Sequence, residues 1–295
     1  MLFLAVALCA QLYAGSPRPQ GESGSKASPP ARALWVWKPE FLKNPSELDS
    51  LLAFAARRRI GAIFLSAHTD WLLRQPQLYR RLLRRSHAQG ISVQALAGEP
   101  EWLLPDHRAG AAAFLEALGE YDRRSRPQER FDALHLDVEP QSLPQWKAGE
   151  RNAVAARYLE FLDWVLRQAQ PQALPLAVDV PVSFNQLAVG STPLIAGIFD
   201  RADQVVVMAY KDTPEKVMEA SREEMGSADA AGKKLWVGIS ADPAHLPSRS
   251  PGGPAESDLE AIAAPVEAAF GRHPAFLGLA IHDYARYRRL VQRSP

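Results

Sequence analysis

The segment 131–140 places three ionisable side chains at a spacing that could do acid–base chemistry. It reads Phe-Asp-Ala-Leu-His-Leu-Asp-Val-Glu-Pro. Side chains of a β-strand alternate between two faces, so we expect His135, Asp137 and Glu139 to share one face and the apolar residues the other. Repulsion from Asp137, together with burial, should raise the pKa of Glu139, as a general acid requires near neutral pH.

Two other interpretations of these side chains stay open. They could form a buried polar cluster that only stabilises the fold, or they could supply ligands to a metal ion. Ligands from one strand leave the coordination incomplete, so we favour catalysis, with Glu139 as general acid/base and Asp137 as the group that tunes or orients it. A direct nucleophile is not identified; Glu99 and Asp179 are the candidates. The choice between a retaining and an inverting reaction therefore stays open.

The elements that must position these groups are eight short apolar runs. They cover residues 33–37, 62–68, 92–98, 132–140, 174–182, 204–210, 234–240 and 276–284. Each interval is long enough for a crossover helix, and some show helical spacing, as in Leu78, Leu82 and Leu83. The pattern predicts an α/β fold, a single-domain (β/α)8 TIM barrel over residues 33–295. A doubly wound open sheet is the alternative, but no glycine-rich dinucleotide loop follows the first run.

In a TIM barrel the chemistry lies at the carboxyl ends of the strands. Tyr210 ends the sixth run, and we expect its hydroxyl to assist catalysis. The other run ends give candidate substrate-binding residues: Trp37, His68, Glu99, His135, Asp179, Met208, Asp212, His282 and Asp283. Aromatic rings among polar groups suit the apolar C–H faces of sugars, so an oligosaccharide or polysaccharide is the expected substrate.

The fourth and sixth runs resemble family 18 glycoside hydrolases, the chitinase-like group. The Asp-x-x-Asp-x-Asp-x-Glu pattern of that family falls on Asp132, His135, Asp137 and Glu139, and its Met-x-Tyr-Asp pattern on Met208, Ala209, Tyr210 and Lys211. The resemblance implies a TIM-barrel glycosidase in which Tyr210 touches the reacting sugar. The string Leu-Asp-Val-Glu also resembles the Asp-x-Glu strand of family 25 muramidases.

The chain departs from the chitinase-like pattern at His135, which replaces a carboxylate, and at Lys211, which replaces an Asp. We expect His135 to donate a hydrogen bond to Asp137 and to hold it ionised. A fixed anion suits an oxocarbenium-like charge better than it suits positioning an N-acetyl group. On that basis we predict an activity that does not depend on a 2-acetamido group.

The amino-acid composition excludes several other classes of protein function. The 295 residues carry a formal net charge of +1, which argues against a dedicated nucleic-acid binder, and no internal apolar run is long enough to span a membrane. Cys9 is the only cysteine, so an intramolecular disulfide is impossible, and no cofactor is expected because no Walker or dinucleotide loop occurs. Residues 1–14 are apolar and predict a signal peptide, whereas residues 15–32 are rich in Gly, Ser and Pro and predict a flexible linker.

The sequence therefore predicts an exported glycoside hydrolase, periplasmic or extracellular, that cleaves a polysaccharide or a cell-envelope glycan by general acid/base catalysis. Whether Cys9 is lipidated stays open. Two further hypotheses remain: a carbohydrate-binding pseudoenzyme with the same cleft, and a metal-dependent hydrolase that uses His135, Asp137 and Glu139.

Overall fold

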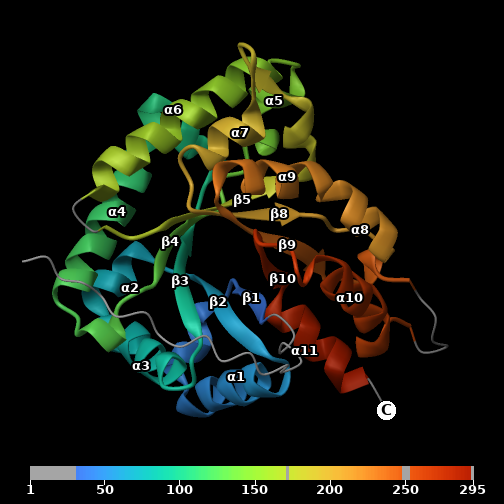
Figure 1. Cartoon of the computed structure of the whole chain (residues 1–295). Helices are drawn as coiled ribbons and strands as arrows, with labels where there is room; N and C mark the ends of the chain where they lie inside the picture. The colour runs from blue at the N-terminus through green and yellow to red at the C-terminus, as the bar shows by residue number, and fades with distance from the viewer. Residues whose placement is uncertain (1–30, 171–172, 248–252, 294–295) are drawn as a thin grey trace, which may run out of the picture.

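The computed structural model describes residues 31–170, 173–247 and 253–293, and within them eight parallel strands close into a barrel (Figure 1). The order around the barrel is β1-β10-β9-β8-β5-β4-β3-β2. The strands are β1 (Arg32–Val36), β2 (Ile60–Ser66), β3 (Ser92–Ala97), β4 (Ala133–Leu136), β5 (Leu176–Pro181), β8 (Gln204–Met208), β9 (Lys234–Ser240) and β10 (Phe276–His282). Each predicted run forms one of them, so the predicted TIM barrel is confirmed.

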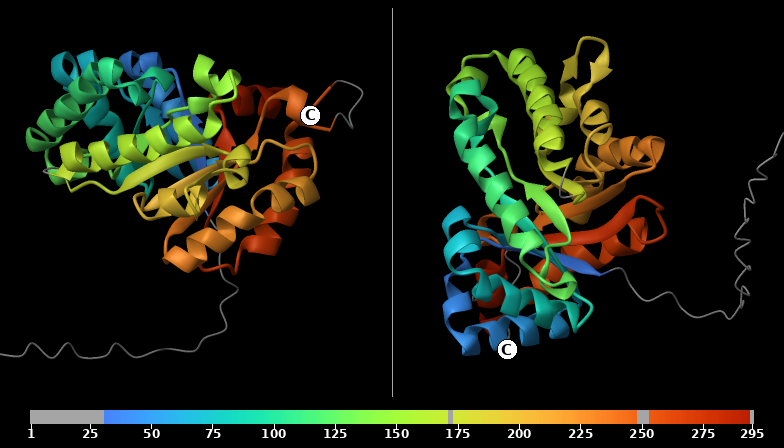
Figure 2. Two further views of the ribbon diagram at one scale, coloured as in Figure 1. Left: turned by 90° about the horizontal axis from the view of Figure 1, so that it is seen from above. Right: turned by 90° about the vertical axis from the view of Figure 1, so that its left-hand side faces the viewer.

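Helices surround the strands (Figure 2). They are α1 (Pro45–Arg57), α2 (Thr69–Arg74), α3 (Pro76–His87), α4 (Arg108–Arg123), α5 (Pro144–Lys147), α6 (Arg151–Ala169), α7 (Leu194–Phe199), α8 (Pro214–Ala220), α9 (Arg222–Ala231), α10 (Glu256–Phe270) and α11 (Tyr284–Arg293). A hairpin of β6 (Ala188–Val189) and β7 (Thr192–Pro193) projects away from the barrel. In the described part of the chain, no helix is long and apolar enough to cross a membrane.

Two apolar cores hold these layers together. The larger lies between strands and helices and includes Leu78, Leu82 and Leu83 of α3, which are buried as their spacing predicts. The smaller lies inside the barrel and consists of Ala33, Trp35, Ala62, Phe64, Leu96, Val206, Trp236 and Ala280, with Trp37 and Leu277 packed against it. Because side chains fill the interior, a substrate can reach only the ends of the barrel.

The N-terminal boundary differs slightly from the prediction. Arg32, expected to end the linker, belongs to β1 and is 2% exposed, because its guanidinium bonds Glu260 and Glu267 on α10. Two carboxylates compensate the burial of this cation. The predicted signal peptide and residues 15–30 of the predicted linker lie outside the described residues, so both stay predictions.

The fourth strand is shorter than the predicted run 132–140. β4 ends at Leu136, and the Asp137 N–H makes one more ladder bond of 3.0 Å, to the Ala97 carbonyl at the end of β3. Pro140 then begins a 3₁₀ turn (Pro140–Ser142), so Glu139 lies in a loop. Gly98 permits the segments that follow β3 and β4 to approach each other closely, because a Cβ added there would lie 2.0 Å from the Asp137 carbonyl oxygen.

Gly98→Ala should therefore displace Asp137 and destabilise the protein by about 2 kcal/mol or more, since the obstructing atom is backbone that cannot rotate away. Gly226→Ala is the matched control. Gly226 is exposed within α9, and an added Cβ meets nothing within 4 Å. This variant should gain about 0.5–1 kcal/mol from helix propensity. Urea unfolding of both variants measures the difference, and equal stabilities would contradict the proposed clash.

Candidate active site

A cavity of about 320 Å³ opens at the carboxyl ends of the strands. It is lined by Trp35, Trp37, Asp137, Glu139, Asp179, Met208, Tyr210 and His282. These side chains come from the ends of β1, β4, β5, β8 and β10 or from the residues that follow them. The structure thus brings together the three residues predicted to be catalytic and four of those predicted to bind substrate.

The other predicted site residues do not line this cavity. Glu99 is exposed and precedes a 3₁₀ turn, so it is not placed as a nucleophile. The His68 ring packs on Trp71 at 5.2 Å, at the start of α2. Asp212 is exposed and pairs with Lys216 at 2.8 Å, and the buried Asp283 pairs with Arg286. In each case the chain has left the strand and turned into a loop or helix.

His135 lies beneath the cavity, inside the barrel, and is completely buried. Its Nε2 is 2.9 Å from Asp179 Oδ1, and its Nδ1 is 2.7 Å from Gln94 Oε1. Asp179 Oδ2 accepts a further bond of 3.0 Å from the Trp35 indole N–H. The expected hydrogen bond from His135 to Asp137 is therefore wrong: the register pairs His135 of β4 with Ala177 of β5, and Asp179, two residues further along, reaches the His135 ring.

A chain of hydrogen bonds fixes which atoms of His135 carry protons. The Trp236 indole can only donate, and it bonds Gln204 Oε1 at 3.2 Å. Gln94 Nε2 donates to the same oxygen at 3.0 Å, which turns Gln94 Oε1 toward His135. Because that oxygen can only accept, His135 Nδ1 carries a proton. The contact between Nε2 and Asp179 then holds one further proton, so the His135–Asp179 pair is neutral as a unit.

This arrangement also contradicts the metal-ligand interpretation of His135. Both ring nitrogens are engaged, one as a donor to an amide oxygen and the other in the shared proton with Asp179. A metal ligand needs a free ring lone pair. Among the described residues, no group of three or more His, Cys, Asp or Glu side chains is arranged to hold a metal ion.

Two carboxyl groups of the cavity, those of Asp137 and Glu139, hold their protons more tightly than usual. Burial, followed by the charges of Asp179 and Glu139, raises the pKa of Asp137 well above its ordinary value, and Asp137 Oδ1 is buried without a hydrogen-bond partner. Burial and then the charge of Asp179 raise the pKa of Glu139. The predicted direction for Glu139 thus agrees with the structure, but the charged neighbour responsible is Asp179 rather than Asp137.

Aromatic side chains form the wall opposite these carboxyls. The Trp37 indole N–H donates to His282 Nε2 at 3.0 Å, so that nitrogen is unprotonated, and burial also lowers the pKa of His282. The Tyr210 ring stacks on His282, with the ring centres 5.3 Å apart. Burial and then the charge of Asp179 raise the pKa of Tyr210 well above its ordinary value, so its hydroxyl is a hydrogen-bond donor to whatever enters.

Sequence reasoning missed Gln94, Gln204 and the indole donor of Trp35. A signal for the first was present, because Gln94 is a polar residue inside the apolar run Ser-Val-Gln-Ala-Leu-Ala. An inward polar residue low in a barrel strand requires a partner, which here is His135 on the adjacent strand. Trp35 fills the barrel interior and also donates a hydrogen bond that fixes Asp179.

No protein-family model matches the chain, and a search of curated proteins also finds no match. Solved structures match its fold. The chitinase from Chromobacterium violaceum ATCC 12472 is 12% identical, with a TM-score of 0.52, over 90% of this chain and 98% of that one. The spore cortex-lytic enzyme SleL from Bacillus megaterium QM B1551 is 14% identical, with a TM-score of 0.54, over 89% of this chain and 73% of that one.

A third structure is a plant class V chitinase mutant from Cycas revoluta in complex with (GlcNAc)3, at 11% identity and a TM-score of 0.50, over 88% of this chain and 97% of that one. The chain thus has the TIM-barrel fold of chitinase-like glycoside hydrolases. The resemblance found in the sequence is confirmed at the level of the fold.

The assigned protons can be tested by nitrogen NMR of the histidine rings. His135 should show a protonated Nδ1, because its neighbour Gln94 Oε1 can only accept a hydrogen bond. His107 is exposed and forms no side-chain hydrogen bond within the described ranges, so it provides the water-exposed reference. An unprotonated Nδ1 of His135 would contradict the assignment.

Asp137→Asn should raise the melting temperature, and the gain should grow with pH. A carboxyl whose pKa is higher in the folded than in the unfolded state makes the fold less stable as pH rises above the unfolded value of about 3.9. The wild type therefore loses stability from about pH 4 toward the raised pKa of Asp137, whereas asparagine does not titrate.

Thermal melts at about pH 4 and pH 8 measure this difference. Asp212→Asn is the control of opposite sign, because Asp212 is exposed and hydrogen bonding to Lys216 lowers its pKa. That variant should show no gain at either pH. A gain for Asp137→Asn that is equal at both pH values would show that its charge is not the cause.

Proposed function

We propose that this protein is a glycoside hydrolase in which Glu139 is the general acid/base. The observation that carries the proposal is the position of Glu139: its carboxyl lines the cavity at the barrel mouth, and burial raises its pKa. An acid that keeps its proton near neutral pH can transfer it to a glycosidic oxygen. The fold, shared with chitinase-like enzymes, supports the same reaction class.

The reaction assigns one role to each polar group. Glu139 gives its proton to the glycosidic oxygen as the bond between that oxygen and the anomeric carbon breaks. Water then adds to the anomeric carbon and returns a proton to Glu139, so the net reaction is hydrolysis. In the His135–Asp179 pair the Asp179 carboxylate faces the cavity, where it stabilises positive charge on the sugar. Asp137 and the Tyr210 hydroxyl orient the substrate.

The substrate we propose is a polysaccharide or a cell-envelope glycan, met outside the cytoplasm as the apolar residues 1–14 suggest. The rings of Trp37 and Tyr210 supply apolar walls for a sugar. The Cycas revoluta chitinase mutant, which has a similar fold, is in complex with (GlcNAc)3, and this supports a sugar as the ligand proposed here.

The prediction that activity would not depend on a 2-acetamido group loses its basis. It required His135 to hold Asp137 as a fixed anion. The two side chains are not bonded to each other, and the pKa of Asp137 is raised, which favours its protonated form. We therefore withdraw that prediction.

A carbohydrate-binding pseudoenzyme is the second candidate. The observation in its favour is the pair of departures from the chitinase-like pattern, His135 and Lys211. The cavity, its aromatic walls and its hydrogen-bond donors would serve binding equally well. The glycoside hydrolase and the pseudoenzyme differ in whether the protein hydrolyses the glycan that it binds.

Glu139→Gln should reduce reducing-sugar release from a glycan substrate by roughly 10²–10⁴-fold while glycan binding survives, because the amide keeps the shape but cannot transfer a proton. Glu101→Gln, at an exposed glutamate outside the cavity, is the control and should keep full activity. Because the acid must be protonated, wild-type activity should fall only as pH rises through the raised pKa of Glu139, above the ordinary value of about 4.3.

Two outcomes would count against this assignment. Unchanged turnover in Glu139→Gln would show that another group is the acid. A wild type that binds glycans but releases no reducing sugar would favour the pseudoenzyme.

A further inference from the structure

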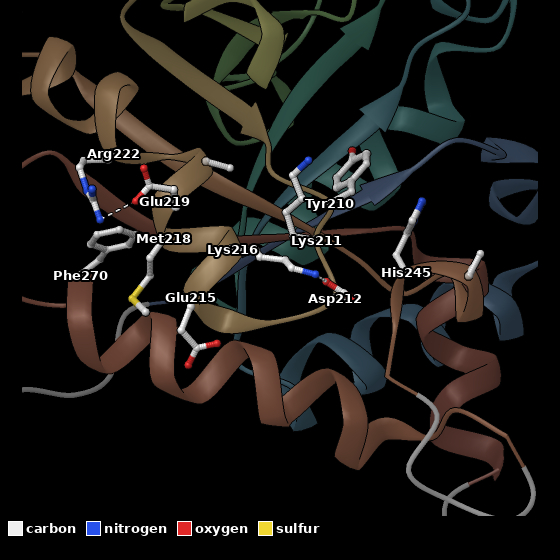
Figure 3. Close-up of a pocket in the computed structure, with 12 residues that line it drawn as sticks. Tyr210, Lys211, Asp212, Glu215, Lys216, Met218, Glu219, Arg222, His245 and Phe270 are labelled. Atoms are coloured by element: carbon white, nitrogen blue, oxygen red, sulfur yellow. Dashed lines mark hydrogen bonds and ion pairs between the residues drawn. The ribbon is translucent and has the colours of Figure 1, made fainter.

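A second and larger cavity, of about 1080 Å³, lies beside the candidate active site (Figure 3). It lies between α8, the 3₁₀ turn after β9 (Pro243–His245) and the end of α10. Its lining comprises Tyr210, Lys211, Asp212, Glu215, Lys216, Met218, Glu219, Ala220, Arg222, Ala244, His245 and Phe270. The sequence analysis did not predict this cavity.

Tyr210 joins the two cavities, because it lines both. Its ring stacks on His282 within the candidate active site, and on His245 at the rim of the larger cavity with the ring centres 6.1 Å apart. The two cavities therefore adjoin at the Tyr210 ring. The larger cavity is placed to receive the next units of the same glycan.

The charges of the larger cavity are mostly paired with each other. Lys216 bonds Asp212 at 2.8 Å, and Arg222 bonds Glu219 at 2.7 Å. Lys211 differs: it is half-buried, and its amino group makes no ion pair or hydrogen bond with any described residue. An ammonium group that has no ion pair among the described residues can pair with an anionic ligand.

Figure 3 shows where this cation lies. The Lys211 side chain rises beside Tyr210, and its amino group is on the same side as the tyrosine hydroxyl. Glu215 also has no ion pair among the described residues, but its carboxylate points toward α10, away from Lys211. Within the lining of the larger cavity, the charged residue nearest to Tyr210 in the sequence is thus a cation.

We propose that the larger cavity binds a carboxylate-bearing sugar, with the Lys211 ammonium paired to the carboxylate. This inference rests on the proposed function and names its substrate class, an acidic glycan. In the chitinase-like pattern an Asp stands at this position, and an Asp would repel such a sugar. Lys211 reverses the sign of the charge, and because it is half-buried its attraction is screened less than that of a surface lysine.

Calorimetric binding in a Glu139→Gln background, which prevents turnover, tests the proposal. The central probe is a tetrasaccharide of alternating N-acetylglucosamine and N-acetylmuramic acid, compared with its carboxyl methyl ester, which keeps the bulk and removes the charge. We expect the acid to bind about tenfold more tightly at low salt, the effect of one hydrogen bond to a charged group, and the preference to shrink at high salt. Tetragalacturonate, an acidic probe of another source, shows which sugar carries the recognised carboxylate.

Lys211→Met should abolish the preference for the acid and leave binding of the methyl ester unchanged, and Lys211→Asp should reverse the preference. Lys233→Met is the control, because Lys233 pairs with Asp203 at 2.9 Å and lines neither cavity. Equal binding of acid and ester by the unsubstituted Lys211 protein would overturn this inference and leave the glycosidase proposal standing. Failure of every probe to bind would also overturn this inference, whereas reducing-sugar release by the wild type and by Glu139→Gln decides the glycosidase proposal.

Discussion

The structure depends on the hydrogen-bonded pair of His135 and Asp179, which lets the barrel keep a carboxyl group in its core. Asp179 is 2% exposed and His135 is completely buried, so an unpaired charge on either would cost several kcal/mol. The shared proton makes the pair neutral, and every remaining polar atom has a partner: Trp35 on one side of Asp179 and Gln94 on the far side of His135. Because indole N–H groups stand at both ends of the chain and can only donate, its direction is fixed.

This direction determines the electrostatics of the mouth. Asp179 lies at the cavity end of the pair and His135 below it, so the negative end of the pair faces the substrate. That negative end, added to burial, raises the pKa of Glu139 and of Asp137. The backbone positions these groups as firmly as the hydrogen bonds do, since Asp137 is bonded to Ala97 and packed against Gly98. The end of the β3–β4 ladder therefore holds Asp137, two residues before Glu139 in the loop that follows.

The sequence predicted the barrel and most of the cavity because both follow local rules. Apolar runs mark strands, and the strand-end rule finds Asp137, Asp179, Tyr210 and His282 without knowledge of any contact. The partner of His135 could not be found in this way. Gln94 and Asp179 lie 41 and 44 residues away, and only the register of β3, β4 and β5 decides that they meet. Asp212 shows the opposite failure, since it follows a strand end but has already turned to pair with Lys216 on α8.

The neutral pair also affects what kind of substrate the mouth can accept. Three carboxyl groups line the cavity, and if all were ionised they would repel an acidic glycan strongly. The Asp179 charge is offset by the proton it shares with His135, and the raised pKa values of Asp137 and Glu139 favour their protonated forms. The mouth is therefore less negative than three free carboxylates would make it. This is the condition that the proposed pairing of an acidic sugar with Lys211 requires.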